Sequence, residues 1–103
     1  MDFPTRLQDV HRRPGAYGLD GSYLNYVAFV NGADAASDGE LLRNFRPWLA
    51  ERLGRGTNLV WWVLVQDIYV ADADVPGDAP LDNEALCNRM FSLLIEYLTD
   101  GAD

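Results

Sequence analysis

The sequence predicts an all-α fold, a compact single domain of four to five helices formed by residues 1–103, and three observations predict it. Several segments place apolar residues at the three- and four-residue spacing of a helix face. Short stretches rich in glycine and proline separate these segments. Hydrophobic residues make up 49% of the 103 residues and aromatic residues 12%, which is enough for one packed core.

The first helix is expected over residues 4–12, which begin with a proline and a threonine, a favourable helix start. Leu7 and Val10 lie three residues apart and would face the core. Pro14 and the glycine after it would end this helix, because proline lacks the backbone N–H that a helix needs. Residues 14–21 contain three glycines and are therefore predicted to form a loop.

The second helix is predicted over residues 23–36, with Ser22 as its N-cap. Its apolar residues follow helical spacing, and one further aromatic residue widens the apolar stripe. A wide stripe is typical of a helix with much of its surface buried. The stripe consists of Tyr23, Tyr26, Val27, Phe29 and Val30.

The third helix is predicted over residues 37–54, the segment with the clearest amphipathic pattern. Ser37 or Asp38 would cap it, and Gly54 would end it. Pro47 lies inside the segment and is expected to kink the helix, or to split it after Phe45. The expected core face holds Leu41, Leu42, Phe45, Trp48, Leu49 and Leu53.

Residues 57–71 form an ambiguous segment. Thr57 or Asn58 could cap a helix, but the β-branched and aromatic residues that follow are also typical of a buried strand. A strand over residues 59–65 would make the fold α+β, and this alternative stays open. We favour a helix, because the surrounding elements are predicted to be helical and fifteen residues is long for one strand.

The last helix is predicted over residues 83–100. Residues 72–80 contain two prolines and are predicted to form the loop before it. Asp82 would cap the helix, Glu84 would lie in its first turn, and Gly101 would end it. The expected core face holds Leu86, Met90, Phe91, Leu94, Tyr97 and Leu98.

The charge of the chain narrows the classes of partner. Acidic residues outnumber basic ones by 16 to 8, for a formal net charge of −8. Nucleic acid and anionic membranes bind proteins mainly through cationic side chains, so neither is an expected partner. The charge favours a basic protein partner, or it serves solubility alone. The N-terminus lacks the apolar stretch of a secretory signal, and the single cysteine forms no internal disulfide, so we expect a cytoplasmic protein.

The sequence contains no set of reactive residues typical of an enzyme, so we expect no enzyme activity and no cofactor. His11 is the single histidine and lies among arginines. It is expected to be a surface or capping residue. Cys87 lies in the last predicted helix beside Leu86, and we expect it to be a buried apolar residue rather than a nucleophile.

The acidic loop contains a near match to a metal-binding pattern. Asp72, Asp74 and Asp78 come near the pattern of an EF-hand calcium loop, since carboxylates are the ligands of hard cations. Pro76 and Asn83, however, stand at two of the ligand positions of that pattern. We therefore expect no metal ion in this loop.

Residues 67–84 are the most acidic stretch and contain no basic residue. Protein interfaces favour an aromatic residue surrounded by polar ones, and Tyr69 could be that anchor. The alternative is a solvated acidic loop in which Asp82 acts only as a helix cap. The predicted partner-binding residues are Asp67, Tyr69, Asp72, Asp74, Asp78, Asp82 and Glu84.

Residues 11–18, HRRPGAYG, are a basic, turn-rich and aromatic stretch in an acidic chain. Such a stretch could bind a phosphate, but no glycine-rich phosphate loop follows it in the sequence. We therefore predict that it turns the chain. The ring of Tyr17 would pack under the loop, and its hydroxyl would reach water or a backbone group.

The stretch RPGAY at residues 13–17 resembles the RPGMY motif of a group of small bacterial proteins. The segments VAFVNG (27–32), FRPWLAER (45–52) and GTNLVW (56–61) follow in the order seen in that group. The resemblance spans residues 6–65. Many proteins of this group look like immunity proteins beside secreted bacterial toxins, so the resemblance implies a binding role without supplying an active site.

Charge and resemblance together favour a non-catalytic immunity protein that binds and blocks a cognate bacterial toxin with a basic face. A self-associating helical protein is the alternative. The adjacent Trp61 and Trp62 cannot point the same way, so one of them could belong to a homodimer face. A small enzyme or ligand-binding domain is the third hypothesis, and the lack of a catalytic set of residues weighs against it.

Overall fold

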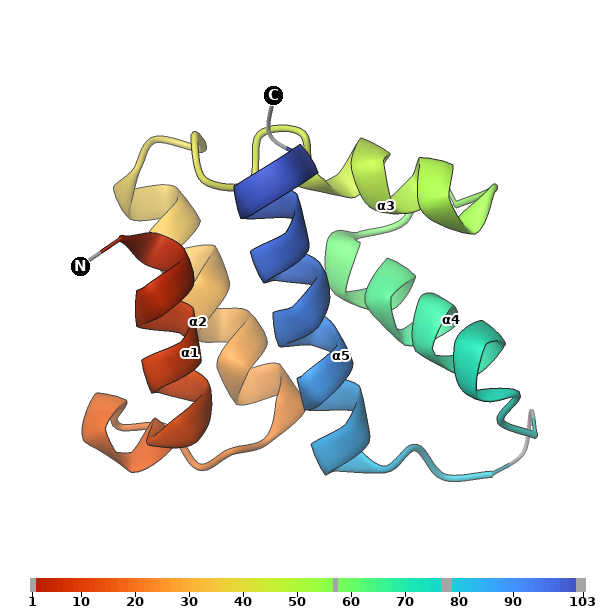
Figure 1. Cartoon of the computed structure of the whole chain (residues 1–103), viewed down its shortest axis with the longest axis horizontal. Coiled ribbons are helices and arrows are strands. Elements are labelled where there is room, and N and C mark those ends of the chain that lie inside the picture. The colour runs from red at the N-terminus through yellow and green to blue at the C-terminus, as the bar shows by residue number, and fades with distance from the viewer. Residues whose placement is uncertain (1, 57, 77–78, 102–103) are drawn as a thin grey trace.

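The computed structural model describes residues 2–56, 58–76 and 79–101, and over these ranges the chain forms five α-helices and no strand (Figure 1). The all-α prediction is confirmed. The alternative of a strand over residues 59–65 is wrong, because residues 61–65 lie in a helix. The helices pack around one hydrophobic core. None of the described helices has the length and apolar character needed to cross a membrane.

The central helix of the bundle is α5 (Asn83–Glu96). It runs between α1 (Phe3–Arg12) and α2 (Tyr23–Ala36) on one side and α4 (Trp61–Ala73) on the other, and it contacts all three (Figure 1). α3 (Phe45–Leu53) lies near the end of α5 and packs on α4 and on the turn that follows α5. The buried residues of α5 are Leu86, Cys87, Met90, Phe91, Leu93 and Leu94.

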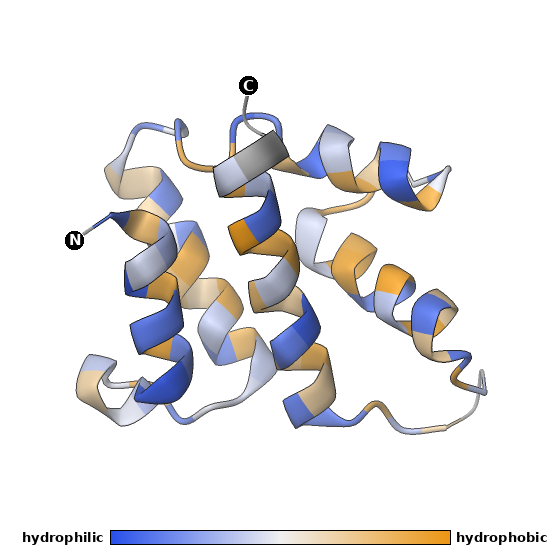
Figure 2. Ribbon diagram, in the orientation of Figure 1, coloured by the Kyte–Doolittle hydropathy of each residue, from blue (hydrophilic) through white to orange (hydrophobic). Residues whose placement is uncertain are grey.

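α1 begins at Phe3, one residue earlier than predicted, because Asp2 caps it. The backbone N–H of Thr5 donates to Oδ1 of Asp2 at 2.9 Å. Figure 2 shows that α1 carries mainly hydrophilic residues, whereas α4 carries mainly hydrophobic ones. Leu7 and Val10 are the apolar residues that α1 buries in the core, as their spacing predicts.

The start of α2 depends on a residue from the other end of the chain. Ser22 precedes α2 as predicted, but within the described residues its side chain makes no capping hydrogen bond. Asn83 of α5 takes this role instead: its Oδ1 accepts from the backbone N–H of Tyr23 at 2.9 Å. Its Nδ2 also donates to the carbonyl oxygen of Gly21 at 2.9 Å. The cap and the helix it caps are therefore 60 residues apart in sequence.

The third helix is shorter than predicted, because residues 37–39 and 41–44 form turns and α3 begins after them. Ser37 and Asp38, the predicted caps of this helix, instead lie where α2 ends. Asp38 has a φ of +56° and Gly39 a φ of +80°. The backbone therefore leaves the right-handed helical region at these residues, and no helix can continue through them.

Pro47 neither kinks a helix nor splits one after Phe45, because it is the third residue of α3. Backbone N–H groups in the first turn of a helix have no intrahelical acceptor, so a proline there removes no hydrogen bond. Of the predicted core face, Phe45 and Leu49 are buried. The half-buried members are Leu41, Leu42, Trp48 and Leu53.

The ambiguous segment is helical, as favoured, but α4 begins four residues later and ends two residues later than predicted. Val60 is its N-cap residue rather than Asn58, and Thr57 lies outside the described residues. α4 ends where Asp74 adopts a φ of +53°. The first two residues of the predicted loop over residues 72–80 are therefore helical.

Asp82 caps α5 as predicted, because its Oδ1 accepts from the backbone N–H of Ala85 at 3.3 Å, and Glu84 lies in the first turn. The α-helix ends at Glu96 and continues as a π-helical turn, Tyr97–Gly101, which reaches the predicted final glycine. In the predicted core face, Leu98 is half-buried and the other residues are buried: Leu86, Met90, Phe91, Leu94 and Tyr97.

Four aromatic rings join α3, α4 and the turn after α5. The ring centroid of Phe45 lies 5.6 Å from that of Trp61 and 5.2 Å from that of Tyr97. Trp48 completes the cluster at 5.6 Å from Tyr97. The hydroxyl of Tyr97 accepts from the backbone N–H of Asn44 at 3.1 Å, so its buried oxygen has a partner. This cluster holds α3 on the rest of the bundle.

We predict that Gly56→Ala lowers the free energy of unfolding by about 1–3 kcal/mol. A Cβ at this position would lie 2.6 Å from Cδ2 of Leu64, and the φ of Gly56 is +85°. Urea unfolding followed by circular dichroism measures the change. Gly32→Ala is the control, because Gly32 lies inside α2 and has open space around it. It should raise stability by about 0.5–1 kcal/mol, and equal effects of the two variants would contradict the prediction.

Candidate functional site

The predicted partner-binding residues lie along the second half of α4, the loop after it and the start of α5. α4 and α5 run in opposite directions, so the end of one and the start of the other lie at the same end of the bundle (Figure 1). Asp78 lies outside the described residues. The described ones lie along this path in the order Asp67, Tyr69, Asp72, Asp74, Asp82 and Glu84. We use the name acidic surface for its exposed carboxylates, Asp72, Asp74, Asp82 and Glu84.

Two arginines from outside residues 67–84 reach the carboxylates of this stretch. Nη1 of Arg55 lies 3.5 Å from Oδ2 of Asp67. Arg89 of α5 forms an ion pair with Asp72 of α4. The sequence interpretation missed both pairs, because only folding brings these arginines to the acidic stretch. The carboxylates of α4, Asp67 and Asp72, are therefore partly neutralised, and among the described residues the less compensated charge lies at Asp74, Asp82 and Glu84.

An open groove of about 480 Å³ lies between α4 and α5, beside the acidic surface. It contains the predicted anchor Tyr69, whose ring is half-buried and packs against the core. It also contains both members of the Asp72–Arg89 pair. The groove thus offers an aromatic ring, ionic groups and small polar groups to a partner's side chain. Its lining is Tyr69, Asp72, Ala73, Ala85, Asn88, Arg89 and Ser92.

The near match to an EF-hand runs from the end of α4 to the start of α5. Among the residues that the structure describes, no three side chains of His, Cys, Asp or Glu lie close enough together to hold a metal ion. Asp74 is the residue that ends α4, and Asp82 caps α5. Gly77 and Asp78, which belong to the pattern, lie outside the described residues.

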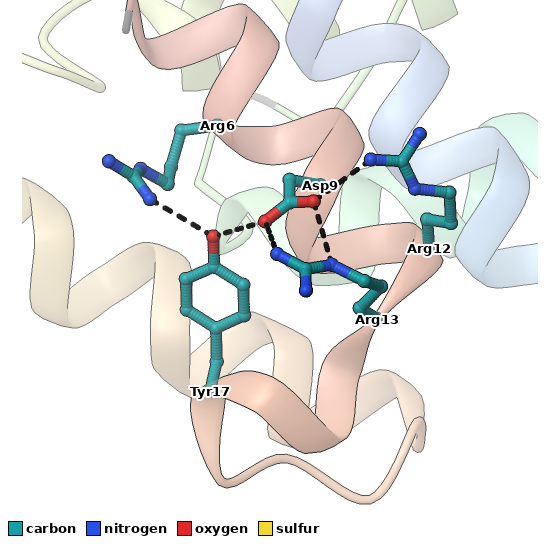
Figure 3. Close-up of polar contacts among 5 residues, drawn as sticks. All are labelled: Arg6, Asp9, Arg12, Arg13 and Tyr17. Carbon is teal, nitrogen blue, oxygen red and sulfur yellow. Dashed lines mark hydrogen bonds and ion pairs between the residues drawn. The ribbon is translucent and has the colours of Figure 1, made fainter.

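A second polar cluster lies at the end of α1, with the carboxylate of Asp9 at its centre (Figure 3). Asp9 is 7% exposed. Arg13 donates from Nε to Oδ1 at 2.9 Å and from Nη2 to Oδ2 at 2.7 Å, and the hydroxyl of Tyr17 donates to Oδ2 at 2.7 Å. Arg12 donates to Oδ1 at 3.0 Å, and Arg6 donates to the Tyr17 hydroxyl at 3.1 Å. These bonds, with Arg13 first and Tyr17 second, hold the pKa of Asp9 well below its ordinary range.

This cluster explains the HRRPGAYG stretch. Pro14–Tyr17 forms one 3-10 turn, and Gly18 ends it with a φ of +75°, which favours glycine. The stretch turns the chain, as predicted, but the Tyr17 hydroxyl reaches a carboxylate rather than water or backbone. The planar fork of Arg13, the group that would suit a phosphate, is engaged by Asp9. Sequence reasoning did not single out Asp9, although its four-residue spacing to Arg13 was a usable signal.

His11 and Cys87 both lie against the core near α5. His11 is half-buried rather than on the surface, and its ring stacks on that of Phe91 with centroids 4.3 Å apart. Cys87 is buried, as predicted, and burial raises the pKa of its thiol to about 11. The thiolate is the nucleophilic form of cysteine, so Cys87 at neutral pH is a poor nucleophile.

We predict that Asp9 makes stability fall at acidic pH. The pKa of Asp9 is lower in the folded chain than its ordinary value of 3.8, so its contribution is complete above that value. The contribution is lost as the pH falls through the folded pKa. Urea midpoints measured from neutral to acidic pH should fall steeply for the wild type and less steeply for Asp9→Asn. Tyr17→Phe should give an intermediate slope, and identical slopes for all three would contradict this role.

We predict that Cys87 reacts with a thiol-reactive dye about 100-fold more slowly in the native chain than in the urea-unfolded chain. Burial and the raised pKa both disfavour the thiolate in the folded state. The absorbance of the released dye measures the rate. N-acetylcysteine in the same two solutions corrects for the effect of urea on the chemistry, and a fast native reaction would show that the thiol is accessible.

Comparison of the chain with protein-family models, with curated proteins and with solved structures gives no match. The resemblance of residues 6–65 to small bacterial proteins of the toxin-immunity type therefore stays a prediction.

Proposed function

We propose that this chain is a non-catalytic protein-binding module, a bacterial immunity protein that neutralises a cognate toxin in the cytoplasm. The observation that carries the proposal is the acidic surface, whose exposed carboxylates lie where α4 ends and α5 begins. A surface of this sign fits a toxin with a basic face, such as a toxin that acts on nucleic acid. Binding there would cover the face that the toxin needs for its substrate.

The net charge supports capture of a basic partner. A chain of net charge −8 attracts a cationic protein over distances of about one Debye length, roughly 8–10 Å at physiological salt. Such attraction raises the association rate and orients the encounter. An inhibitor that has to reach a toxin before the toxin reaches its substrate benefits from fast association.

The local structure supports a preorganised surface. Asp82 is held by its capping hydrogen bond, and Asp72 and Glu84 project from helices. Side chains on packed helices lose less freedom on binding than side chains on long loops, so more of the contact energy appears as affinity. Tyr69, held against the core, is placed to be an aromatic anchor beside these charges.

A homodimer through the paired tryptophans has less support. Trp61 is 6% exposed, and its Nε1 donates to Oδ1 of Asn31 at 2.9 Å. Trp62 is half-buried and packs against the core. The exposed large apolar residues in the described part of the chain are Leu24 and Val60, and single apolar residues of this kind are normal on a monomer.

The experiment is growth rescue and binding with the product of the neighbouring toxin gene. The double variant Asp72→Arg/Glu84→Arg should lower affinity for the toxin by about 100-fold and abolish rescue. Glu40→Arg/Glu51→Arg is the matched control, because it makes the same change of net charge at exposed residues outside the acidic surface. Glu40 is paired with Arg43 as Asp72 is with Arg89, so each variant breaks one ion pair.

Wild-type affinity should fall as salt is added, because the contact is ionic. Equal losses for the two double variants would contradict the acidic surface as the binding site. A neighbouring gene that encodes no toxin, together with a stable dimer in light scattering, would contradict the immunity proposal and favour self-association.

A further inference from the structure

Arg89 has an unusual position in the groove between α4 and α5. Its side chain is 26% exposed, and Nη2 pairs with Asp72, which is 56% exposed. Its Nε, however, is buried and has no hydrogen-bond acceptor among the residues that the structure describes. Most buried N–H groups in folded proteins have an acceptor, so this exception calls for a physical explanation.

The Asp72–Arg89 pair is easily exchanged. An ion pair with a carboxylate this exposed contributes little to stability, because water screens it. A buried N–H without an acceptor is destabilising. Moving the Arg89 guanidinium away from Asp72 into water would therefore give up a weak contact and hydrate the Nε–H. The carboxylate of Asp72 would then be available to another cation.

The groove around Asp72 suits a cationic side chain. Tyr69 lies one helical turn before Asp72 on α4, so both line the same face of the groove. An aromatic face attracts a cation, and a carboxylate pairs with it. Asn88 and Ser92 line the opposite wall from α5 and offer side-chain oxygens as acceptors for further N–H groups.

We propose that the groove between α4 and α5 binds a guanidinium or ammonium side chain of the partner, and that Arg89 is paired with the carboxylate of Asp72 in the free chain. The incoming cation replaces Arg89 at the carboxylate and lies along Tyr69, while Arg89 turns toward solvent. This proposal rests on the proposed function, because it takes the partner to be a basic protein. It adds that a cationic side chain of the partner enters the groove, and that Arg89 competes with this side chain for the carboxylate of Asp72.

The test measures binding of an octa-arginine peptide by calorimetry at low ionic strength. Arg89→Met removes the competitor and should tighten binding by about fivefold more than Arg52→Met. Arg52→Met is the matched control, since Arg52 also forms a partly exposed ion pair, with Glu96, and its loss changes the net charge equally. In an Asp72→Asn background, Arg89→Met should tighten binding no more than Arg52→Met does.

A second readout follows Arg89 directly. In the wild type, the nuclear magnetic resonance signal of the Arg89 Nε–H should exchange faster with water when the peptide is added, because Arg89 then leaves its buried position. If the peptide binds but Arg89→Met and Arg52→Met act equally, the groove proposal is wrong and the acidic surface stands. If the wild type does not bind the peptide even at low ionic strength, both the groove proposal and the proposed cationic partner are wrong.

Discussion

Burial of α5 is the constraint on which the rest of the bundle depends. α1, α2 and α4 all pack on this helix, and α3 packs on α4 and on the turn after α5. Full burial of one Leu, Met or Phe side chain contributes about 1.5–3 kcal/mol, and α5 buries several of them. Asn83, at the start of α5, accepts from the first backbone N–H of α2, and Tyr97, in the turn after α5, accepts from the backbone N–H of Asn44, the residue before α3. This part of the chain therefore supplies buried residues to the core and also forms hydrogen bonds at the starts of α2 and α3.

Local signals in the sequence predicted those elements whose ends are set by neighbouring residues. The Asp82 cap and the buried face of α5 are of this kind, because a cap and a helical stripe can both be read within a few residues. The predicted start of the third helix was wrong because the hydrophobic pattern continued through Asp38 and Gly39. Such a pattern does not reveal the positive φ values of these two residues. The turns there are held by Asp34, whose Oδ1 accepts from the backbone N–H of Leu42 at 2.9 Å.

The candidate site shows the same division. The carboxylates of residues 67–84 were visible in the sequence, but Asp72, which was expected in the loop, lies in the last turn of α4. The pairing of Asp72 with Arg89 was not visible, because it joins two helices across a groove. The Asp9 cluster combines both cases: its spacing to Arg13 is local, whereas the return of Tyr17 over α1 needs the 3-10 turn. A charge count over a stretch of sequence thus overstates the charge that the folded surface presents.

The capping of α2 by Asn83 has a consequence for synthesis on the ribosome. The chain leaves the exit tunnel from its N-terminus, so α1 to α4 emerge before the residue that caps α2 and before the helix on which they pack. Until then α1, α2 and α4 lack the helix that all three contact, although α3 and α4 can already pack on each other. Native packing of α1, α2 and α4 in this protein therefore waits until α5 has left the ribosome.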